Sequence, residues 1–252
     1  MNNKEALQKA YEILSPYSNK QRWELNNNLV HLRFITKHIS KESSILDVGC
    51  GIGILDIALI LLGYHVAGVD KYLFESNNSF SISDIDGLKR IWESQGLSIL
   101  PKDILQDDVL EMYGAVISIA TIEHQKDPKR FLERILGVIR PGGFIYIATP
   151  NISHLLNRIR FLFGMSPMSG HLQNFFNRGE LYEGHWREYT LGELRQIFVW
   201  VSILVVSSRN VQSMRPGFRA LSPRSWYVSL FRVLSYVILG TRDTNIIIGK
   251  KD

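Results

Sequence analysis

The chain of 252 residues is 45% hydrophobic and 21% charged, a composition that indicates a globular protein and excludes a disordered or fibrous one. Its formal net charge of +5 lies in the C-terminal part, because residues 200–252 carry +6 and residues 1–199 carry −1. The one cysteine, Cys50, excludes an internal disulfide, and the seven histidines show no paired spacing for a metal, so we expect a reducing cytoplasm and no metal ion.

Helices and strands alternate along most of the chain. Apolar residues at helical spacing predict two helices, over residues 4–14 and 21–39, ahead of the first strand. Short apolar runs then predict strands over residues 44–49, 65–70, 97–101, 114–120, 144–150, 202–208 and 244–250. Helices are predicted between them over residues 54–63, 84–96, 127–139 and 191–198, with "RPGG" at 140–143 ending the third of these.

This alternation predicts the fold class. Short apolar strands separated by helices indicate a doubly wound α/β fold with a mostly parallel, seven-stranded sheet and helices on both faces. The short connection before the last strand favours an antiparallel pairing there, and ligands are expected beyond the carboxyl ends of the strands. We interpret 1–252 as one domain, with N-terminal helices (1–42), a cofactor-binding core (43–150), an insertion over the pocket (151–190) and a basic, aromatic excursion before the last strand (210–242).

The excursion holds the most apolar stretch of the C-terminal part, a run of 14 residues that is too short to span a membrane. If residues 225–239 are helical, the polar residues share one narrow face and the remaining surface is apolar. That surface packs on the protein's own core, on a second subunit of a homodimer, or into a membrane interface. The upstream arginines lead to the hypothesis of peripheral contact with the inner membrane face through residues 212–240.

Three glycines at alternate positions, Gly49, Gly51 and Gly53, follow the first strand. They let the backbone turn sharply and approach a ligand closely. A dinucleotide-binding turn has its third glycine one residue later, and the charge of Asp47 would oppose a pyrophosphate. The turn therefore favours a cationic ligand, and Cys50 within it is interpreted as a small packed side chain.

Asp70 closes the second predicted strand, 21 residues after Gly49. A carboxylate at this place accepts hydrogen bonds from both hydroxyls of a ribose. The alternative interpretation is a helix cap or a turn residue. Together with the glycines, Asp70 predicts a ligand that carries a ribose.

Four segments, in order, resemble class I S-adenosylmethionine-dependent methyltransferases. They are the glycine turn after "SILDVG", "PKDIL" at 101–105, "ATIEHQKDPKRFLERILGVIRPGGFIYIATPN" at 120–151, and "GHWREYTLGELRQIF" at 184–198. The resemblance covers most of residues 43–199, and the last segment is similar to one in the type 11/23-like subgroup near glycan and lipid biosynthesis methyltransferases. The resemblance implies S-adenosylmethionine as the cofactor.

By this resemblance Asp103 would accept a hydrogen bond from the adenine amino group, with Ile104 nearby. Leu73 and Tyr72 would pack on the adenosine. Gly114 stands where family members usually carry an acidic residue. The cofactor-binding residues that the resemblance implies are Asp47, Gly49, Cys50, Gly51, Gly53, Asp70, Lys71, Tyr72, Asp103, Ile104, Ala120 and Thr121.

Methyl transfer from a sulfonium is an in-line displacement, so a base is needed only for acceptors that must lose a proton. Histidine is the natural base for a hydroxyl acceptor. His124, at the end of the fourth strand, and His185, in the segment over the pocket, are the catalytic candidates, and each has a structural alternative. Glu123 either orients His124 or lies in solvent. Arg187 and Glu188 are expected to pair with each other or to bind polar groups of an acceptor.

The sequence therefore predicts an S-adenosylmethionine-dependent methyltransferase that acts, most simply on oxygen, on a small molecule, a sugar or a lipid-linked glycan. Two alternatives stay open: a nicotinamide-dependent sugar oxidoreductase, and a non-catalytic relative that keeps the cofactor. Arginines interleave with phenylalanines between residues 158 and 178, but no nucleic-acid-binding module accompanies them, so we expect no nucleic-acid partner.

Overall fold

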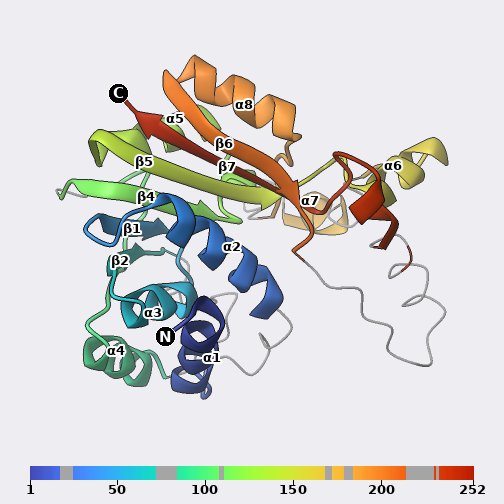
Figure 1. The fold of residues 1–252 in the computed structure, drawn as a ribbon. Helices are drawn as coiled ribbons and strands as arrows, with labels where there is room; N and C mark the ends of the chain where they lie inside the picture. The colour runs from blue at the N-terminus through green and yellow to red at the C-terminus, as the bar shows by residue number, and fades with distance from the viewer. Residues whose placement is uncertain are drawn as a thin grey trace.

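The computed structural model describes residues 1–17, 25–71, 84–107, 111–167, 172–178, 184–213, 230 and 233–252 (Figure 1). Within these residues a seven-stranded sheet has the order β3-β2-β1-β4-β5-β7-β6. β1 pairs in parallel with β2 and β4, whereas β7 runs antiparallel to both β5 and β6. This confirms the predicted sheet and its antiparallel last strand. The strands are β1 (Ser44–Val48), β2 (His65–Val69), β3 (Ser98–Leu100), β4 (Tyr113–Ile119), β5 (Ile139–Pro150), β6 (Ile203–Val211) and β7 (Thr244–Lys251).

Helices cover both faces of the sheet, as the sequence predicted (Figure 1). One face packs against α1 (Asn3–Ile13), α2 (Leu25–His38), α3 (Ile54–Leu61) and α4 (Ile85–Ser94), and the other against α5 (Pro128–Gly137) and α8 (Leu191–Trp200). Successive strand residues point to opposite faces, so Ile45 and Leu46 of β1 belong to different cores. Local signals set the helix ends: Thr190 and Glu193 form a capping box at the start of α8.

The predicted end of the helix at "RPGG" is corrected by the structure. α5 ends at Gly137, and residues 140–143 lie within β5, which begins at Ile139. Ile139 already pairs with Tyr113, and a shift in register lies between Tyr113 and Ala115. A Cβ at Gly143 would lie 2.7 Å from the Gly114 carbonyl oxygen, so the close approach of two glycines lets the strand continue through the bend.

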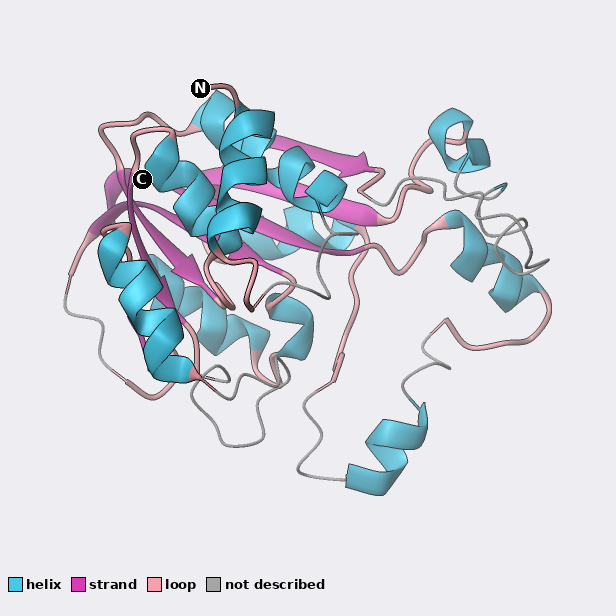
Figure 2. Cartoon of the chain, turned by 90° about the horizontal axis from the view of Figure 1, so that it is seen from below, coloured by secondary structure: helices cyan, strands magenta, loops and turns pink. Residues whose placement is uncertain are grey.

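The insertion at 151–190 contains two helices that the sequence did not predict, α6 (Leu155–Leu162) and α7 (Leu172–Arg178). They lie beyond the carboxyl end of β5, away from the helices that cover the sheet (Figure 2). Asn151 and Tyr189 form a parallel bridge, so the insertion leaves and returns at one point. The side-chain amide of buried Asn151 also donates to the carbonyl oxygens of Gly240 and Arg242, and these hydrogen bonds connect the insertion to the end of the excursion.

Some predictions fall outside the described residues. Leu73 and Tyr72 are among them, as is most of the segment 212–240. Of that segment, residues 233–237 are helical and Val237 and Leu239 are exposed. In the described part of the chain no helix has both the length and the apolar character that crossing a membrane requires.

Candidate active site

A pocket lies at the carboxyl ends of the central parallel strands. Six of the residues that the sequence proposed for the cofactor line it: Gly49, Asp70, Lys71, Asp103, Ile104 and Thr121. They come from the ends of β1, β2, β3 and β4, which meet at one edge of the sheet. The sequence did not single out the other lining residues, which are Val48, Val69, Lys102, Gln125 and Phe131.

The glycine turn connects β1 to α3, and neighbouring side chains explain why glycine is needed at two of its three positions. Gly49, Gly51 and Gly53 all have positive φ angles, of 82°, 56° and 79°. A Cβ at Gly49 would lie 2.4 Å from the Thr121 hydroxyl oxygen, and a Cβ at Gly53 would lie 2.8 Å from a methyl of Leu97. The sequence explained these glycines by the approach of a ligand. At Gly49 and Gly53 the approach of neighbouring side chains already requires glycine.

Asp70 follows β2 and is buried beside the glycine turn. The backbone N–H of Gly51 donates to its Oδ2 over 2.9 Å. This hydrogen bond fixes the turn against the end of β2, and the carboxylate lines the pocket where a ribose was predicted. The hydrogen bond to Gly51 matches the turn role that the sequence offered as the alternative, and the ribose role stays a prediction.

Asp103 also lines the pocket, but its carboxylate already has partners. Lys71 Nζ donates to Oδ2 over 3.1 Å, and the backbone N–H of Leu105 donates to Oδ1 over 2.9 Å. An adenine amino group would therefore share this carboxylate with Lys71. Arg134 donates to the carbonyl oxygen of Ile104 over 2.9 Å, which fixes the backbone beside the predicted adenine site.

Two further carboxyl groups are buried behind the glycine turn. Asp47 is on β1 and Asp56 is on the first turn of α3, and they are 4% and 0% exposed. Among the described residues no donor reaches Asp47 Oδ1 or either carboxyl oxygen of Asp56 when both groups are ionised, whereas a proton on one of them allows a hydrogen bond to the other. Burial, together with the charge of Asp70, raises the pKa of Asp47 to about 7. Burial, followed by the charge of Asp47, raises the pKa of Asp56 well above its ordinary value.

Of the described residues proposed for the cofactor, five do not line the pocket: Asp47, Cys50, Gly51, Gly53 and Ala120. Cys50 points toward β2, since a Cβ added to Gly68 would lie 2.6 Å from its sulfur. Burial raises the pKa of the Cys50 thiol well above its ordinary value, which suits the predicted packed side chain. Ala120 is exposed at the end of β4 and has a φ of 52°, an unusual angle for a residue other than glycine.

These residues fit a cationic, ribose-bearing cofactor such as S-adenosylmethionine. Three buried carboxyl groups, of Asp47, Asp56 and Asp70, lie close to the turn, and negative charge held among them is stabilised by a nearby positive charge. Val48, Val69, Ile104 and Phe131 give the pocket an apolar wall suited to an adenine ring.

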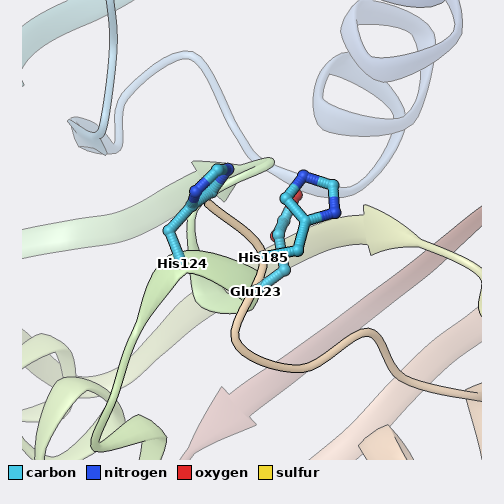
Figure 3. A group of neighbouring side chains, drawn as sticks. All are labelled: Glu123, His124 and His185. Carbon is cyan, nitrogen blue, oxygen red and sulfur yellow. The ribbon is translucent and has the colours of Figure 1, made fainter. Parts of the chain in front are cut away.

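A second group of polar side chains lies beyond β4 and β5. Glu123 and His124 belong to η3 (Ile122–His124), which follows β4, and His185 comes from the end of the insertion (Figure 3). The rings of His124 and His185 meet edge to face with centroids 4.8 Å apart. The backbone N–H groups of Trp186 and Arg187 donate to the Glu123 carbonyl oxygen over 2.7 and 3.3 Å, which holds the two segments together. The two catalytic candidates are thus neighbours.

The Glu123 side chain differs from both of its predicted roles. It is fully buried, and its Oε2 accepts a hydrogen bond of 2.8 Å from the Thr149 hydroxyl, so it neither lies in solvent nor hydrogen-bonds His124 through that oxygen. Burial raises the pKa of Glu123 to about 7, although the Thr149 hydrogen bond and the charge of His185 act to lower it. The consequence is a carboxyl group that is poised to change its charge near neutral pH.

His185 is held by Glu188, whose Oε1 lies 2.8 Å from His185 Nδ1. Burial lowers the pKa of His185, but the hydrogen bond to Glu188 and the charges of Glu123 and Glu188 outweigh burial and raise it above its ordinary value. The expected pairing of Arg187 with Glu188 is wrong, because Arg187 pairs with Glu193 at 2.7 Å. The capping box places Glu193 within reach of Arg187, and this leaves Glu188 to His185.

Three further residues of the site had little signal in the sequence: Asp56, Gln125 and Thr149. Asp56 stands in an apolar helix, where a lone acidic residue among buried neighbours was the available signal. Gln125 donates to the Thr121 carbonyl oxygen over 3.0 Å, and Thr149 lies at the end of β5, but neither belongs to a recognisable motif.

Comparison with the sequences of known proteins also indicates a methyltransferase. A family model described as a methyltransferase domain matches residues 19–187. Two relatives are named ubiquinone biosynthesis O-methyltransferase. The protein of Paraburkholderia phymatum is 29% identical over 129 residues, 49% of this chain and 52% of that protein, and the protein of Coxiella burnetii is 28% identical over 168 residues, 64% and 68%. The chain thus spans about half to two thirds of the curated relatives it matches.

Solved structures share the fold at low sequence identity. The 1,6-didemethyltoxoflavin-N1-methyltransferase of Burkholderia thailandensis, bound to S-adenosylhomocysteine, aligns with a TM-score of 0.58 and 15% identity over 96% of this chain and 87% of that one. The phosphoethanolamine N-methyltransferase 2 of Haemonchus contortus, bound to S-adenosyl-L-methionine, aligns with a TM-score of 0.59 and 17% identity over 100% of this chain and 60% of that one. At such identities the likeness concerns the fold.

Proposed function

Since the chain belongs to the family of S-adenosylmethionine-dependent methyltransferases, we propose that it transfers a methyl group to a hydroxyl group of a small-molecule acceptor. The observation that carries this proposal is the pair of histidines beside the cofactor pocket, with buried Glu123 behind them. Oxygen as the acceptor atom is supported by the O-methyltransferase names of the relatives and by the presence of groups that accept a proton.

On the cofactor side, the chain's own residues bind and orient. Asp70 accepts from the ribose while it holds the Gly51 N–H, and Asp47 places negative charge beneath the turn. When bound, S-adenosylmethionine supplies the methyl group on a positively charged sulfur. The apolar side chains of the pocket wall keep water from the adenine side of the site.

On the acceptor side, His185 is the group suited to take a proton. His185 Nδ1–H donates a hydrogen bond to the Glu188 carboxylate, and this favours the neutral tautomer in which Nε2 carries the lone pair. A proton that enters at Nε2 is stabilised by the carboxylates of Glu123 and Glu188, which raise the pKa of the ring. His124 packs edge to face with the His185 ring and lies with it on the acceptor side that we propose.

The acceptor that we propose has an apolar part, as in a lipid-linked sugar or another lipid-linked small molecule. Trp186, next to His185, packs edge to face on Phe175 of α7 at 6.0 Å, so α7 borders the acceptor side. All residues of α7 are exposed, and Phe176 is 84% exposed. Leu239, in the excursion, is 90% exposed. Such apolar surfaces mark interaction sites, and we propose peripheral contact with a membrane there.

A panel of acceptors tests the function. The purified chain is incubated with labelled S-adenosylmethionine and a free sugar, a lipid-linked sugar or a prenylated phenol, and the product is examined for a methyl ether. We expect transfer to the oxygen of a lipid-linked acceptor. Transfer to nitrogen, or binding of a nicotinamide cofactor in place of S-adenosylmethionine, would overturn the proposal, and cofactor binding without transfer to any acceptor would favour a non-catalytic relative.

A further inference from the structure

We propose that Glu123, His124 and His185 bind a divalent transition-metal ion at the acceptor side of the pocket. One ligand atom from each residue lies within 4.8 Å of the others, and the three side chains converge from two segments of the chain (Figure 3). The sequence predicted no metal because His124 and His185 stand 61 positions apart. The site stands on this cluster alone. The role of the ion in methyl transfer rests on the proposed function, and with the ion bound the lone pair of His185 Nε2 holds the metal in place of accepting the proton.

The buried carboxyl group of Glu123 gives independent support. The side chain is 0% exposed, its Oε2 accepts from the Thr149 hydroxyl, and its Oε1 has no hydrogen-bond partner within the described ranges. Burying a carboxylate oxygen without a partner is unfavourable, and coordination to a cation is one of the few ways to compensate for it. Oε1 is therefore the ligand atom that we assign to Glu123.

The surroundings of His185 resemble those of a metal-binding histidine. A ligating imidazole usually donates a hydrogen bond from its other ring N–H to a carboxylate or carbonyl oxygen, and this hydrogen bond fixes the orientation of the ring. Glu188 Oε1 lies 2.8 Å from Nδ1, so Nε2 is the ligand atom that we assign to His185. The carbonyl oxygen of Glu123 accepts from the N–H groups of Trp186 and Arg187, so the backbone already holds the two ligand-bearing segments in place.

The distances require a modest contraction around the ion. Ligand atoms in a tetrahedral zinc site lie about 3.4 Å apart, because the bonds to nitrogen and oxygen are about 2.0 to 2.1 Å long. The largest separation of 4.8 Å must therefore shorten by about 1.4 Å. His124 and His185 are only partly buried, so rotation about their side-chain bonds allows this movement.

Two imidazoles and one carboxylate suit zinc and neighbouring transition metals better than magnesium or calcium, which prefer oxygen ligands. Three protein ligands leave a position for another oxygen, as in catalytic zinc sites. An acceptor hydroxyl bound there would lose its proton to water, because the ion lowers the pKa of the oxygen it holds. The oxygen then forms a bond to the methyl carbon while the sulfur–carbon bond breaks and the sulfonium becomes a thioether. No electron donor or acceptor is needed.

Calorimetry on the full chain tests the site. After dialysis against a chelator, the protein is titrated with zinc, and cobalt absorption reports the coordination geometry. We expect one ion per chain. Glu123→Gln and His185→Gln should each weaken binding at least about 100-fold, and Glu188→Gln about 10- to 100-fold, the range for residues behind the ligands. His65→Gln is the matched control, because His65 is exposed at the start of β2, and it should bind zinc normally.

The outcomes separate the site from the proposed function. Absence of zinc binding, or equal binding by the wild type and the three variants, would overturn the site. If Glu123→Gln does not fold, His124→Gln on a partly exposed position decides the same question. Zinc binding with no methyl transfer to any acceptor would support the metal site and refute the proposed function. Undiminished transfer by the metal-free protein would leave the function, with His185 as the base, and would refute the role of the ion in transfer.

Discussion

Replacing Asp56 by Asn should stabilise the protein at neutral pH. Asp56 is 0% exposed, and its carboxyl group lies beside that of Asp47, with which it forms a hydrogen bond when one of the two carries a proton. Burial and the charge of Asp47 raise its pKa well above its ordinary value, so the folded protein keeps a proton there that the unfolded chain releases. Stability that depends on this proton is complete below the unfolded pKa and is lost as the pH rises toward the folded one.

The magnitude follows from linkage. Each proton that only the folded state holds lowers the free energy of unfolding by about 1.4 kcal/mol per pH unit. The loss begins near the unfolded pKa of about 4 and continues, at no more than this slope, over the pH range in which the folded protein keeps the proton. Asn does not titrate, so Asp56→Asn should match the wild type near pH 4 and gain on it by up to about 1.4 kcal/mol for each pH unit above that.

Urea unfolding followed by circular dichroism between pH 4 and pH 8, without cofactor, measures the difference. Asp47 and Asp56 interact directly, so the substitution also changes the titration of Asp47, and we expect stability to fall less steeply with pH in Asp56→Asn than in the wild type. Asp86→Asn is the control, because that side chain is 76% exposed, and it should change stability by no more than about 0.5 kcal/mol. Parallel curves for the wild type and Asp56→Asn would refute the reasoning.

Three further changes test the cofactor site and the apolar surface. Gly49→Ala adds a Cβ 2.4 Å from a threonine hydroxyl at a φ of 82° and should lower the free energy of unfolding by about 2 to 3 kcal/mol, whereas Gly137→Ala, with open space, should not. Asp70→Asn should weaken S-adenosylmethionine binding by about 1 to 3 kcal/mol in calorimetry, and unchanged affinity would remove Asp70 from the site. The protein should float with anionic vesicles at low salt, and Phe176→Ser combined with Leu239→Ser should abolish this. Wild-type protein that stays unbound would exclude membrane contact.

Much of the fold was predictable because its signals are local. Patterns a few residues long predict the strand before Gly49, the helix that ends near Gly63 and the aspartate after β2. Parallel strands then bring their carboxyl ends to one edge of the sheet. The helices α6 and α7 were missed because exposed helices in an insertion lack a clear apolar period. Gly114 was noted as a departure, and the structure explains it, since a Cβ there would lie 3.1 Å from that of Ser43.

The sequence by itself determined the sheet, the glycine turn and the carboxylate that meets it, because each depends on residues that are neighbours along one strand or turn. Only the tertiary structure decided that Glu123 and His185, 62 positions apart, face each other, and that Glu188 rather than Arg187 takes part. It also decided that Asp56 is buried beside Asp47. The physical reason is that charge state and partner choice depend on burial and on distance in space, and both are set when residues 185–187 pack against the segment that follows β4.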